Sequence, residues 1–251
     1  MQEIAANLER VQERIARAAE RAGRRPDDVL LIAVSKTVEP ARIRAALTAG
    51  VRALGENRVQ EARTKIADLG RPVPWHLIGP LQTNKVKDAV ELFDMIQSVD
   101  RLALAQEIDR RARGRGPTLD VLLEINVAGE STKSGFAPDA LPGALDAVAA
   151  LTSLRVRGLM AIPPAGEQPE ASRAWFRTLA SLARRHGLAE LSMGMSGDFE
   201  VAVEEGATMV RVGTAIFGAR PARPAPSERD QEREASRPAP SERPLERERS
   251  A

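Results

Sequence analysis

The feature that most constrains this chain is a regular alternation between short apolar runs and longer amphipathic stretches. The first apolar run covers residues 29–34, has the length of a strand and is apolar at every position. Strands of this kind are typically covered on both faces, as in parallel sheets wrapped by helices. Residues 2–22, which precede it, have apolar residues every three or four positions, the spacing of a helix that buries one face. Further strands are predicted at 53–54, 75–78, 94–97, 119–127, 156–162, 190–193 and 208–212.

Helices are predicted between these strands, and several of them end at a glycine, which is a common signal for the C-terminus of a helix. Eight strands in strict alternation with helices over about 215 residues match the inventory and size of a (β/α)8 barrel, or TIM barrel. An open, doubly wound sheet is the competing interpretation. The helices are predicted at 39–49, 57–69, 82–92, 100–113, 138–151, 169–187 and 198–205.

The last part of the chain has a different composition. Residues 220–251 contain six Pro, eight Arg and seven acidic residues, and Leu245 is their one large aliphatic residue. Such a segment cannot bury enough apolar surface to offset the entropy lost on ordering. Within it RPAPSER occurs twice, from Arg223 and from Arg237, as a low-complexity duplication. We therefore expect a single α/β domain in residues 1–219 and a disordered Pro/Arg/Glu-rich tail in residues 220–251.

Composition excludes several classes of protein. The 251 residues include no Cys and two His, so disulfides, thiolate sites and multi-histidine metal cages are excluded and no metal is expected. The formal net charge is +2, and no basic stripe with interleaved aromatic residues indicates nucleic-acid binding. No uncharged stretch approaches the roughly 20 residues that span a bilayer, and the first residues lack the apolar core of a signal peptide. We expect a soluble, cytoplasmic protein that binds neither nucleic acid nor membrane.

A candidate reactive lysine follows the first predicted strand. In a (β/α)8 barrel the chemistry takes place on the loops after the carboxyl ends of the strands, which is where Lys36 lies. A lysine with its stem against apolar walls loses hydration. This favours the neutral amine, a nucleophile that can form a Schiff base with a carbonyl group. An ordinary surface lysine just past a strand is the alternative interpretation.

A candidate anion site follows the last two predicted strands. Ser196-Gly197 opens a helix, and Gly213-Thr214 opens a short turn. Backbone N–H groups at the start of a helix attract anions, and the loops after strands 7 and 8 frequently form the phosphate pocket of such barrels. Tight turns alone would also explain these glycines. A reactive lysine facing a phosphate pocket indicates a phosphorylated aldehyde, and pyridoxal 5′-phosphate (PLP) is the common cofactor of that kind.

Seven sequence blocks occur in a fixed order: LIAVSKT (31–37), GENRVQE (55–61), WHLIGPLQTNK (75–85), EINVAGESTKSGF (124–136), GLMAI (158–162), LSMGMSGDFE (191–200) and VRVGTAIFG (210–218). Together they resemble the pyridoxal phosphate homeostasis protein family, also called YggS-like or PROSC-like. The resemblance covers residues 4–218 and implies a (β/α)8 barrel of the alanine racemase N-terminal-domain type. Members of this family often end soon after the last block with Arg-x-Tyr, whereas here Arg220 leads into the polar tail.

The resemblance also implies how PLP would be held. The cofactor would be covalently bound to Lys36 as a Schiff base. Ser196, Gly213 and Thr214 would hold its phosphate group, and Arg211 would be the partner of the pyridine nitrogen. Because an arginine does not readily supply a proton, the ring nitrogen would stay neutral and the cofactor would be a poor electron sink.

Further residues are implied to line the cofactor ring. Asn57, His76 and Met160 lie at matching strand ends. For His76, a buried histidine with satisfied hydrogen bonds is an equally good interpretation. Lys133, in the loop after the fifth strand, is a candidate second contact for the phosphate or the aldehyde, and a solvated loop lysine is the alternative.

Three functions are compatible with these residues. The first is a PLP-binding protein that holds the cofactor and hands it over without substrate turnover, with PLP-dependent apo-enzymes as candidate partners, and we expect it to be a monomer. The second is a PLP-dependent enzyme such as an amino-acid racemase, and the third is an aldolase that uses Lys36 directly on a sugar phosphate. Racemisation in the related fold needs Lys and Tyr as two bases, the Tyr coming from a second, β-rich domain. This sequence has no Tyr, and the residues after 219 are too few and too polar for that domain. Since losing one partner of an acid–base pair costs about 10²–10⁴-fold, we expect negligible racemase activity and classify the protein as a non-enzyme.

Overall fold

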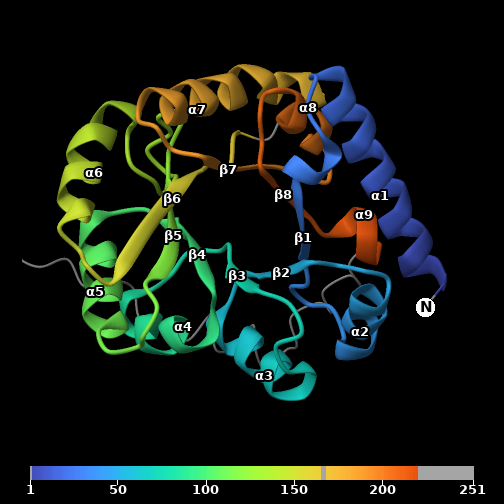
Figure 1. The fold of residues 1–251 in the computed structure, drawn as a ribbon, viewed down its shortest axis with the longest axis horizontal. Coiled ribbons are helices and arrows are strands. Elements are labelled where there is room, and N and C mark those ends of the chain that lie inside the picture. The colour runs from blue at the N-terminus through green and yellow to red at the C-terminus, as the bar shows by residue number, and fades with distance from the viewer. Residues whose placement is uncertain (1, 165–167, 220–251) are drawn as a thin grey trace, which may run out of the picture. The chain divides into compact units, whose positions relative to one another are not determined.

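Eight parallel strands close into a barrel in the order β1 to β8 (Figure 1), in a computed structural model that describes residues 2–164 and 168–219. β1 pairs with β2 on one side and with β8 on the other, where Leu30 lies opposite Met209, so the sheet is closed. The predicted (β/α)8 TIM barrel is confirmed, and the predicted tail at 220–251 lies outside the described residues. The strands are β1 (Leu30–Val34), β2 (Ala53–Glu56), β3 (Trp75–Leu77), β4 (Met95–Val99), β5 (Leu119–Glu124), β6 (Leu154–Met160), β7 (Glu190–Met195) and β8 (Met209–Val212).

Helices surround the barrel and follow the strands in sequence (Figure 1). The first helix precedes β1 and packs against α8 and α9 through an apolar stripe that includes Ile4, Leu8 and Val11. The α-helices are α1 (Gln2–Arg21), α2 (Pro40–Thr48), α3 (Val59–Leu69), α4 (Val86–Leu92), α5 (Leu102–Ala112), α6 (Leu141–Ala149), α7 (Arg173–Arg185), α8 (Phe199–Glu204) and α9 (Thr214–Phe217). Short 3-10 helices are η1 (Pro26–Asp28), η2 (Thr83–Lys85), η3 (Pro138–Ala140) and η4 (Pro169–Ser172).

Several element boundaries differ by a few residues from the sequence-based prediction, including those of β5 and α7. β5 was predicted to reach residue 127 but ends at Glu124, because the chain folds back and the Phe136 N–H donates to the Glu124 carbonyl at 2.8 Å. The predicted helix at 169–187 is divided into η4 and α7, and α7 begins at Arg173. Both differences lie at the ends of elements near the mouth of the barrel.

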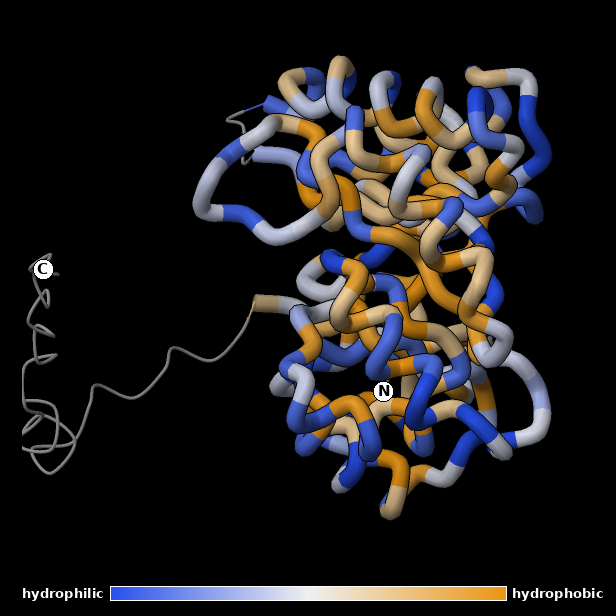
Figure 2. Tube along the Cα trace, turned by 90° about the vertical axis from the view of Figure 1, so that its left-hand side faces the viewer, coloured by the Kyte–Doolittle hydropathy of each residue, from blue (hydrophilic) through white to orange (hydrophobic). Residues whose placement is uncertain are grey.

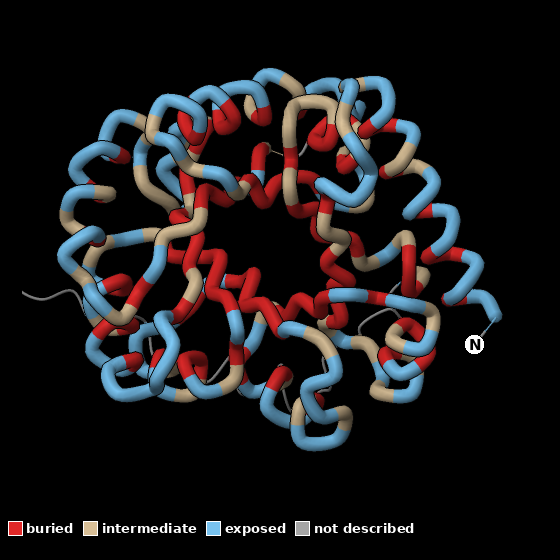
Figure 3. The backbone as a smooth tube through the Cα atoms, in the orientation of Figure 1, coloured by how far each residue is buried: buried red, intermediate tan, exposed pale blue. Residues whose placement is uncertain are grey.

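Strand side chains alternate between two hydrophobic layers. The larger core lies between strands and helices and contains Leu54, Trp75 and Phe176. A smaller cluster fills the inside of the barrel, so the barrel is a packed core and not a pore. Figure 3 shows the strands as a buried ring, surrounded by helices that are exposed on their outer sides. Figure 2 colours the backbone by hydropathy. The inner cluster consists of Ile32, Ala53, Met95, Leu122, Met160 and Met209.

Two kinds of feature are absent from residues 2–164 and 168–219. No helix there is long and apolar enough to cross a membrane. No group of three or more His, Cys, Asp or Glu side chains there is arranged to hold a metal ion.

Candidate functional site

Lys36 lies in the turn that directly follows β1, and its side chain is half-buried. The next residue, Thr37, has a φ of 62°, a left-handed conformation that is unusual for a β-branched residue. The Thr37 N–H donates to the Glu61 carboxylate, and the Thr37 hydroxyl donates to the Lys36 carbonyl at 2.6 Å. These bonds fix the backbone on the carboxyl side of Lys36.

The amino side of Lys36 is held by a buried lysine on α3. The Lys65 ammonium donates to the Ser35 carbonyl, to Glu56 Oε1 at 2.7 Å and to Glu61 Oε1 at 2.6 Å. The Ser35 hydroxyl also donates to Glu56 Oε1, at 2.7 Å. Burial raises the pKa of Glu56 above its ordinary value, and the hydrogen bond from Lys65 opposes this shift. The turn at Lys36 therefore rests on a compact ionic cluster between the barrel and α3.

The candidate phosphate turn lies beside the end of β1. A Cβ added at Gly213 would lie 3.2 Å from the Val34 carbonyl oxygen, so this glycine lets the turn after β8 approach β1 closely. The Gly213 N–H lies 3.4 Å from Ser196 Oγ, its hydrogen-bond acceptor, and exposed Thr214 begins α9. The structure thus brings together the three residues predicted to hold phosphate, next to the strand that leads into Lys36.

Arg211 lies on β8 inside the barrel, two residues after Met209 of the inner cluster, and is 3 % exposed. Its guanidinium donates to Ser192 Oγ at 2.6 Å and to the Ala161 carbonyl at 2.9 Å. Burial lowers the pKa of Arg211 to about 10, which still leaves it cationic at neutral pH. A buried cation therefore lies directly below the predicted phosphate turn along the same strand.

The three residues predicted to line the ring have different surroundings. Met160 is fully buried in the inner cluster at the end of β6. Asn57 is half-buried directly after β2, and its Oδ1 atom is buried without a hydrogen-bond partner among the described residues. His76, on β3, is 5 % exposed, and its Nδ1 lies 2.9 Å from Gln97 Nε2. Burial lowers the pKa of His76 to about 4, so the ring is neutral at physiological pH.

Sequence reasoning missed three polar residues inside the barrel. Gln97 on β4 and Ser192 on β7 are fully buried, and they connect His76 to Arg211 by hydrogen bonds. Glu124, the last residue of β5, has its pKa raised to about 7, mainly by burial and also by Asp100. Each strand also carries another polar residue, so polarity alone did not distinguish these three in the sequence.

Lys133 lies in the loop after β5. Its ammonium forms an ion pair with Glu130 at 2.8 Å. It lines a cavity of about 460 Å³ whose wall includes Ile162, Met195 and Asp198. A second contact from Lys133 to phosphate or aldehyde stays a prediction.

Comparison with known proteins defines the class of this barrel. The family model described as the alanine racemase N-terminal domain matches residues 6–221. The pyridoxal phosphate homeostasis protein of Pseudomonas aeruginosa is 49 % identical over 223 residues, covering 88 % of this chain and 97 % of the relative. That of Escherichia coli K12 is 45 % identical over 229 residues, covering 88 % and 98 %. The chain therefore belongs to the pyridoxal phosphate homeostasis protein family, as its sequence blocks predicted.

A solved structure from the same comparison carries a ligand. PipY of Synechococcus elongatus PCC7942, described with PLP bound, is 41 % identical to this chain, with a TM-score of 0.74. The match covers 86 % of this chain and 100 % of PipY.

Proposed function

We propose that this protein binds PLP in intracellular PLP homeostasis, holding the cofactor on Lys36 as a Schiff base without turning over a substrate. The observation that carries the proposal is the packing of Gly213 against Val34, two residues before Lys36. The turn proposed to bind phosphate thereby lies next to the strand that leads into Lys36, the proposed covalent lysine. The PLP-bound PipY structure supports the same ligand for this chain.

The side chains at the mouth fit a phosphorylated pyridine aldehyde. The backbone N–H groups at the start of α9 are donors for an anion. The hydroxyl groups of Ser196 and Thr214 add donors for phosphate oxygens. The buried Oδ1 of Asn57 is an acceptor available to a hydroxyl group of the ligand. Donors and acceptors therefore match the phosphate and phenolic groups of PLP.

The remaining residues favour retention over catalysis. When bound, PLP supplies an aldehyde that condenses with an amine, with loss of water, and a ring that withdraws electrons. Lys36 provides the amine. Arg211 has donors and no acceptor, so it binds a pyridine nitrogen that carries no proton, which weakens electron withdrawal by the ring.

The racemase alternative requires a second base on the other face of the cofactor. The sequence contains no tyrosine to serve as that base. We therefore expect alanine racemisation to be negligible when the PLP-loaded protein is assayed by chiral chromatography. Racemisation at rates typical of enzymes would contradict the assignment as a binding protein.

Delivery to other proteins is the second part of the proposed role. A carrier should reactivate a PLP-dependent apo-enzyme faster than an equal concentration of free PLP does, or protect PLP from a scavenging amine during transfer. Equal rates with and without the protein would limit its function to storage.

The decisive experiment is the visible absorption spectrum of the purified, PLP-loaded protein. The wild type should show a visible absorption band, and borohydride should fix the cofactor on Lys36, as peptide mass spectrometry would show. Lys36→Ala should lose both signals. Lys87→Ala, which removes an exposed lysine on α4, is the matched control and should keep both.

Two results would contradict the proposal. Borohydride-fixed PLP on another lysine in the wild type would remove Lys36 from its role. A colourless wild type that is fixed by borohydride to a sugar phosphate would instead support the aldolase alternative.

A further inference from the structure

A single chain of hydrogen bonds crosses the inside of the barrel from β8 to β3. Arg211 donates to Ser192 Oγ at 2.6 Å, and the Ser192 hydroxyl donates to Gln97 Oε1 at 2.6 Å. Gln97 Nε2 in turn lies 2.9 Å from His76 Nδ1. The exposure of these four side chains is between 0 % and 5 %. They therefore form one buried polar path through the inner hydrophobic cluster.

The direction of every hydrogen bond in this path follows from Arg211. A guanidinium has donors and no acceptor, so Ser192 Oγ must accept from it and must direct its own hydrogen to Gln97 Oε1. The amide of Gln97 then presents its NH₂ group to His76 Nδ1, which must accept. This assigns His76 as the neutral tautomer with hydrogen on Nε2, in agreement with the low pKa that burial gives this histidine.

The path holds the cation of Arg211 with neutral groups. Ser192 Oγ and the Ala161 carbonyl accept two of its five N–H donors, and no ion pair to Arg211 occurs among the described residues. Glu124 and Asp198 act on Arg211 at longer range. A neutral support leaves the positive charge and the other donors for a ligand at the barrel mouth.

We infer that Ser192 and Gln97 are positioning residues that orient Arg211 toward the pyridine nitrogen and thereby set how tightly PLP is retained. The inference rests on the proposed function, since it concerns the same cofactor. It assigns a role to Ser192 and Gln97, which are 95 positions apart in sequence and act on the site through Arg211. His76 ends the path as a hydrogen-bond acceptor at Nδ1.

The test compares Ser192→Ala with the wild type by titrating each protein with PLP and recording the visible spectrum. Removing the hydroxyl should weaken PLP binding about tenfold, the size of effect expected for one orienting hydrogen bond, and should shift the absorption maximum. Thr208→Val is the matched control, because it removes a hydroxyl between β7 and β8 at their amino ends. The control should retain the wild-type Kd and spectrum.

A double-mutant cycle shows whether Ser192 acts through Arg211. Ser192→Ala should have little effect on the Kd in an Arg211→Lys background, because the guanidinium that it orients is gone. Additive effects in this cycle would overturn the inference, and so would an unchanged Kd and spectrum in a folded Ser192→Ala protein. A wild type that fails to bind PLP would instead refute the proposed function.

A second variant keeps the test decisive if Ser192→Ala does not fold. Gln97→Glu has the same size, but its carboxylate cannot donate to His76 Nδ1 and so favours a protonated His76. The charged neighbours of His76, Asp94 and Asp120, also favour protonation. PLP retention should then become pH-dependent near neutrality, whereas the wild type should show no such dependence from this histidine. A Gln97→Glu protein with the wild-type Kd at every pH would overturn the inference.

Discussion

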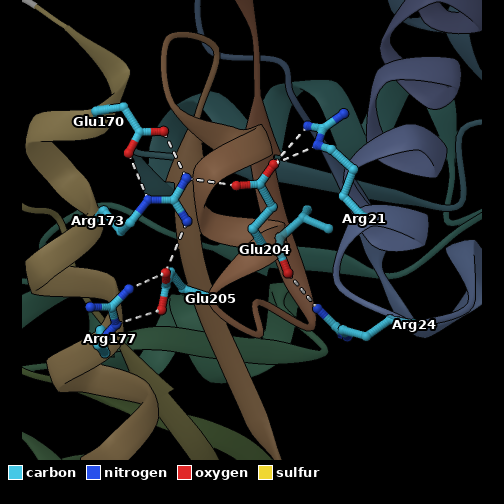
Figure 4. A network of polar contacts seen from close by, with 8 residues as sticks. Arg21, Arg24, Glu170, Arg173, Arg177, Glu204 and Glu205 are labelled. Atoms are coloured by element: carbon cyan, nitrogen blue, oxygen red, sulfur yellow. Dashed lines mark hydrogen bonds and ion pairs between the residues drawn. The ribbon is translucent and has the colours of Figure 1, made fainter.

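Lys65 and Arg173 each contact several oxygen atoms, but one does so in the core and the other at the surface. Lys65 bonds Glu56 and Glu61 at 2.7 and 2.6 Å, and the side chains of Lys65 and Glu56 are 7 % and 0 % exposed. Arg173 on α7 bonds Glu170, Glu204 and Glu205 at 2.6–2.9 Å, and its side chain is 27 % exposed (Figure 4).

The two clusters also differ in what they hold together. The Lys65 cluster fixes a backbone turn, since its third acceptor is the Ser35 carbonyl beside Lys36. An ammonium group has three hydrogens and can donate to three acceptors arranged around it.

The Arg173 cluster joins helices. Arg21 of α1 shares Glu204 with Arg173, and Arg177 shares Glu205 with Arg173 (Figure 4). A planar guanidinium suits carboxylates on several sides. The buried Lys65 cluster therefore positions the backbone of the candidate site, whereas the partly exposed Arg173 cluster links the outer helices.

The largest expected effect comes from Lys65→Met. This change leaves the carboxylate of Glu56 buried without its cation, and it should lower the free energy of unfolding by about 3–5 kcal/mol in denaturant titrations. Lys87→Met on α4 is the control for loss of an exposed lysine and should change stability by less than about 0.5 kcal/mol.

A double variant tests whether the loss comes from the unpaired carboxylate. Lys65→Met with Glu56→Gln should be less destabilised than the sum of the two single changes, because no buried charge remains. Strict additivity would show that Lys65 stabilises the protein through packing alone, and would weaken the contrast with Arg173.

A smaller effect is expected from Arg173→Ala. Three partly exposed ion pairs are lost together, which should cost about 1–2 kcal/mol at low ionic strength. The cost should shrink in 1 M salt, where charges are screened beyond about 3 Å, whereas the Lys65→Met effect should persist. Arg184→Ala on the same helix removes an exposed arginine and serves as control. Equal salt dependence of the stability loss in the Lys65 and Arg173 variants would contradict the inference that burial shields the Lys65 cluster from salt.

The fold was predictable because it depends on local patterns. The alternation of strands and helices indicated the barrel, and even the two-residue run at 53–54 marks a real strand, β2. The ends of β5 and α7 were less predictable, since they depend on contacts such as Phe136 with Glu124 that the pattern of one segment does not contain.

The site was predictable in part for the same reason. Lys36 and Gly213 could be chosen because each follows a predicted strand, and the barrel brings strand ends together. The partners of Arg211 could not be chosen, because a hydrogen bond between Ser192 and Gln97 spans the barrel and leaves no periodic signal in the sequence. The role of Lys65 was hidden in the same way, since one buried lysine on an amphipathic helix resembles its exposed neighbours. Assigning roles in PLP binding to these residues stays a prediction for the experiments above.

The smallest expected effect is a difference in the sign of pH dependence between the two clusters. Burial raises the pKa of Glu56, whereas hydrogen bonds from Arg177 and Arg173 lower the pKa of Glu205, both relative to an ordinary value of 4.5. The folded protein therefore holds the Glu56 proton to higher pH than the unfolded chain does, so this group contributes less stability as pH rises above 4.5. Glu205 behaves oppositely: its contribution is present above 4.5 and is lost as pH falls through its folded pKa.

Denaturant titrations of Glu56→Gln and Glu205→Gln between pH 3.5 and about 6 separate these signs. Because each substitution removes one titrating group, the stability lost by Glu205→Gln should grow with rising pH, and the stability lost by Glu56→Gln should diminish. Each trend should stay below about 1.4 kcal/mol per pH unit, the limit for a difference of less than one bound proton. If the stability lost by the two variants changed with pH in the same direction, Lys65 would offset the effect of burial on the pKa of Glu56, as the arginines do for Glu205. In that case burial would not explain the difference between the Lys65 and Arg173 clusters.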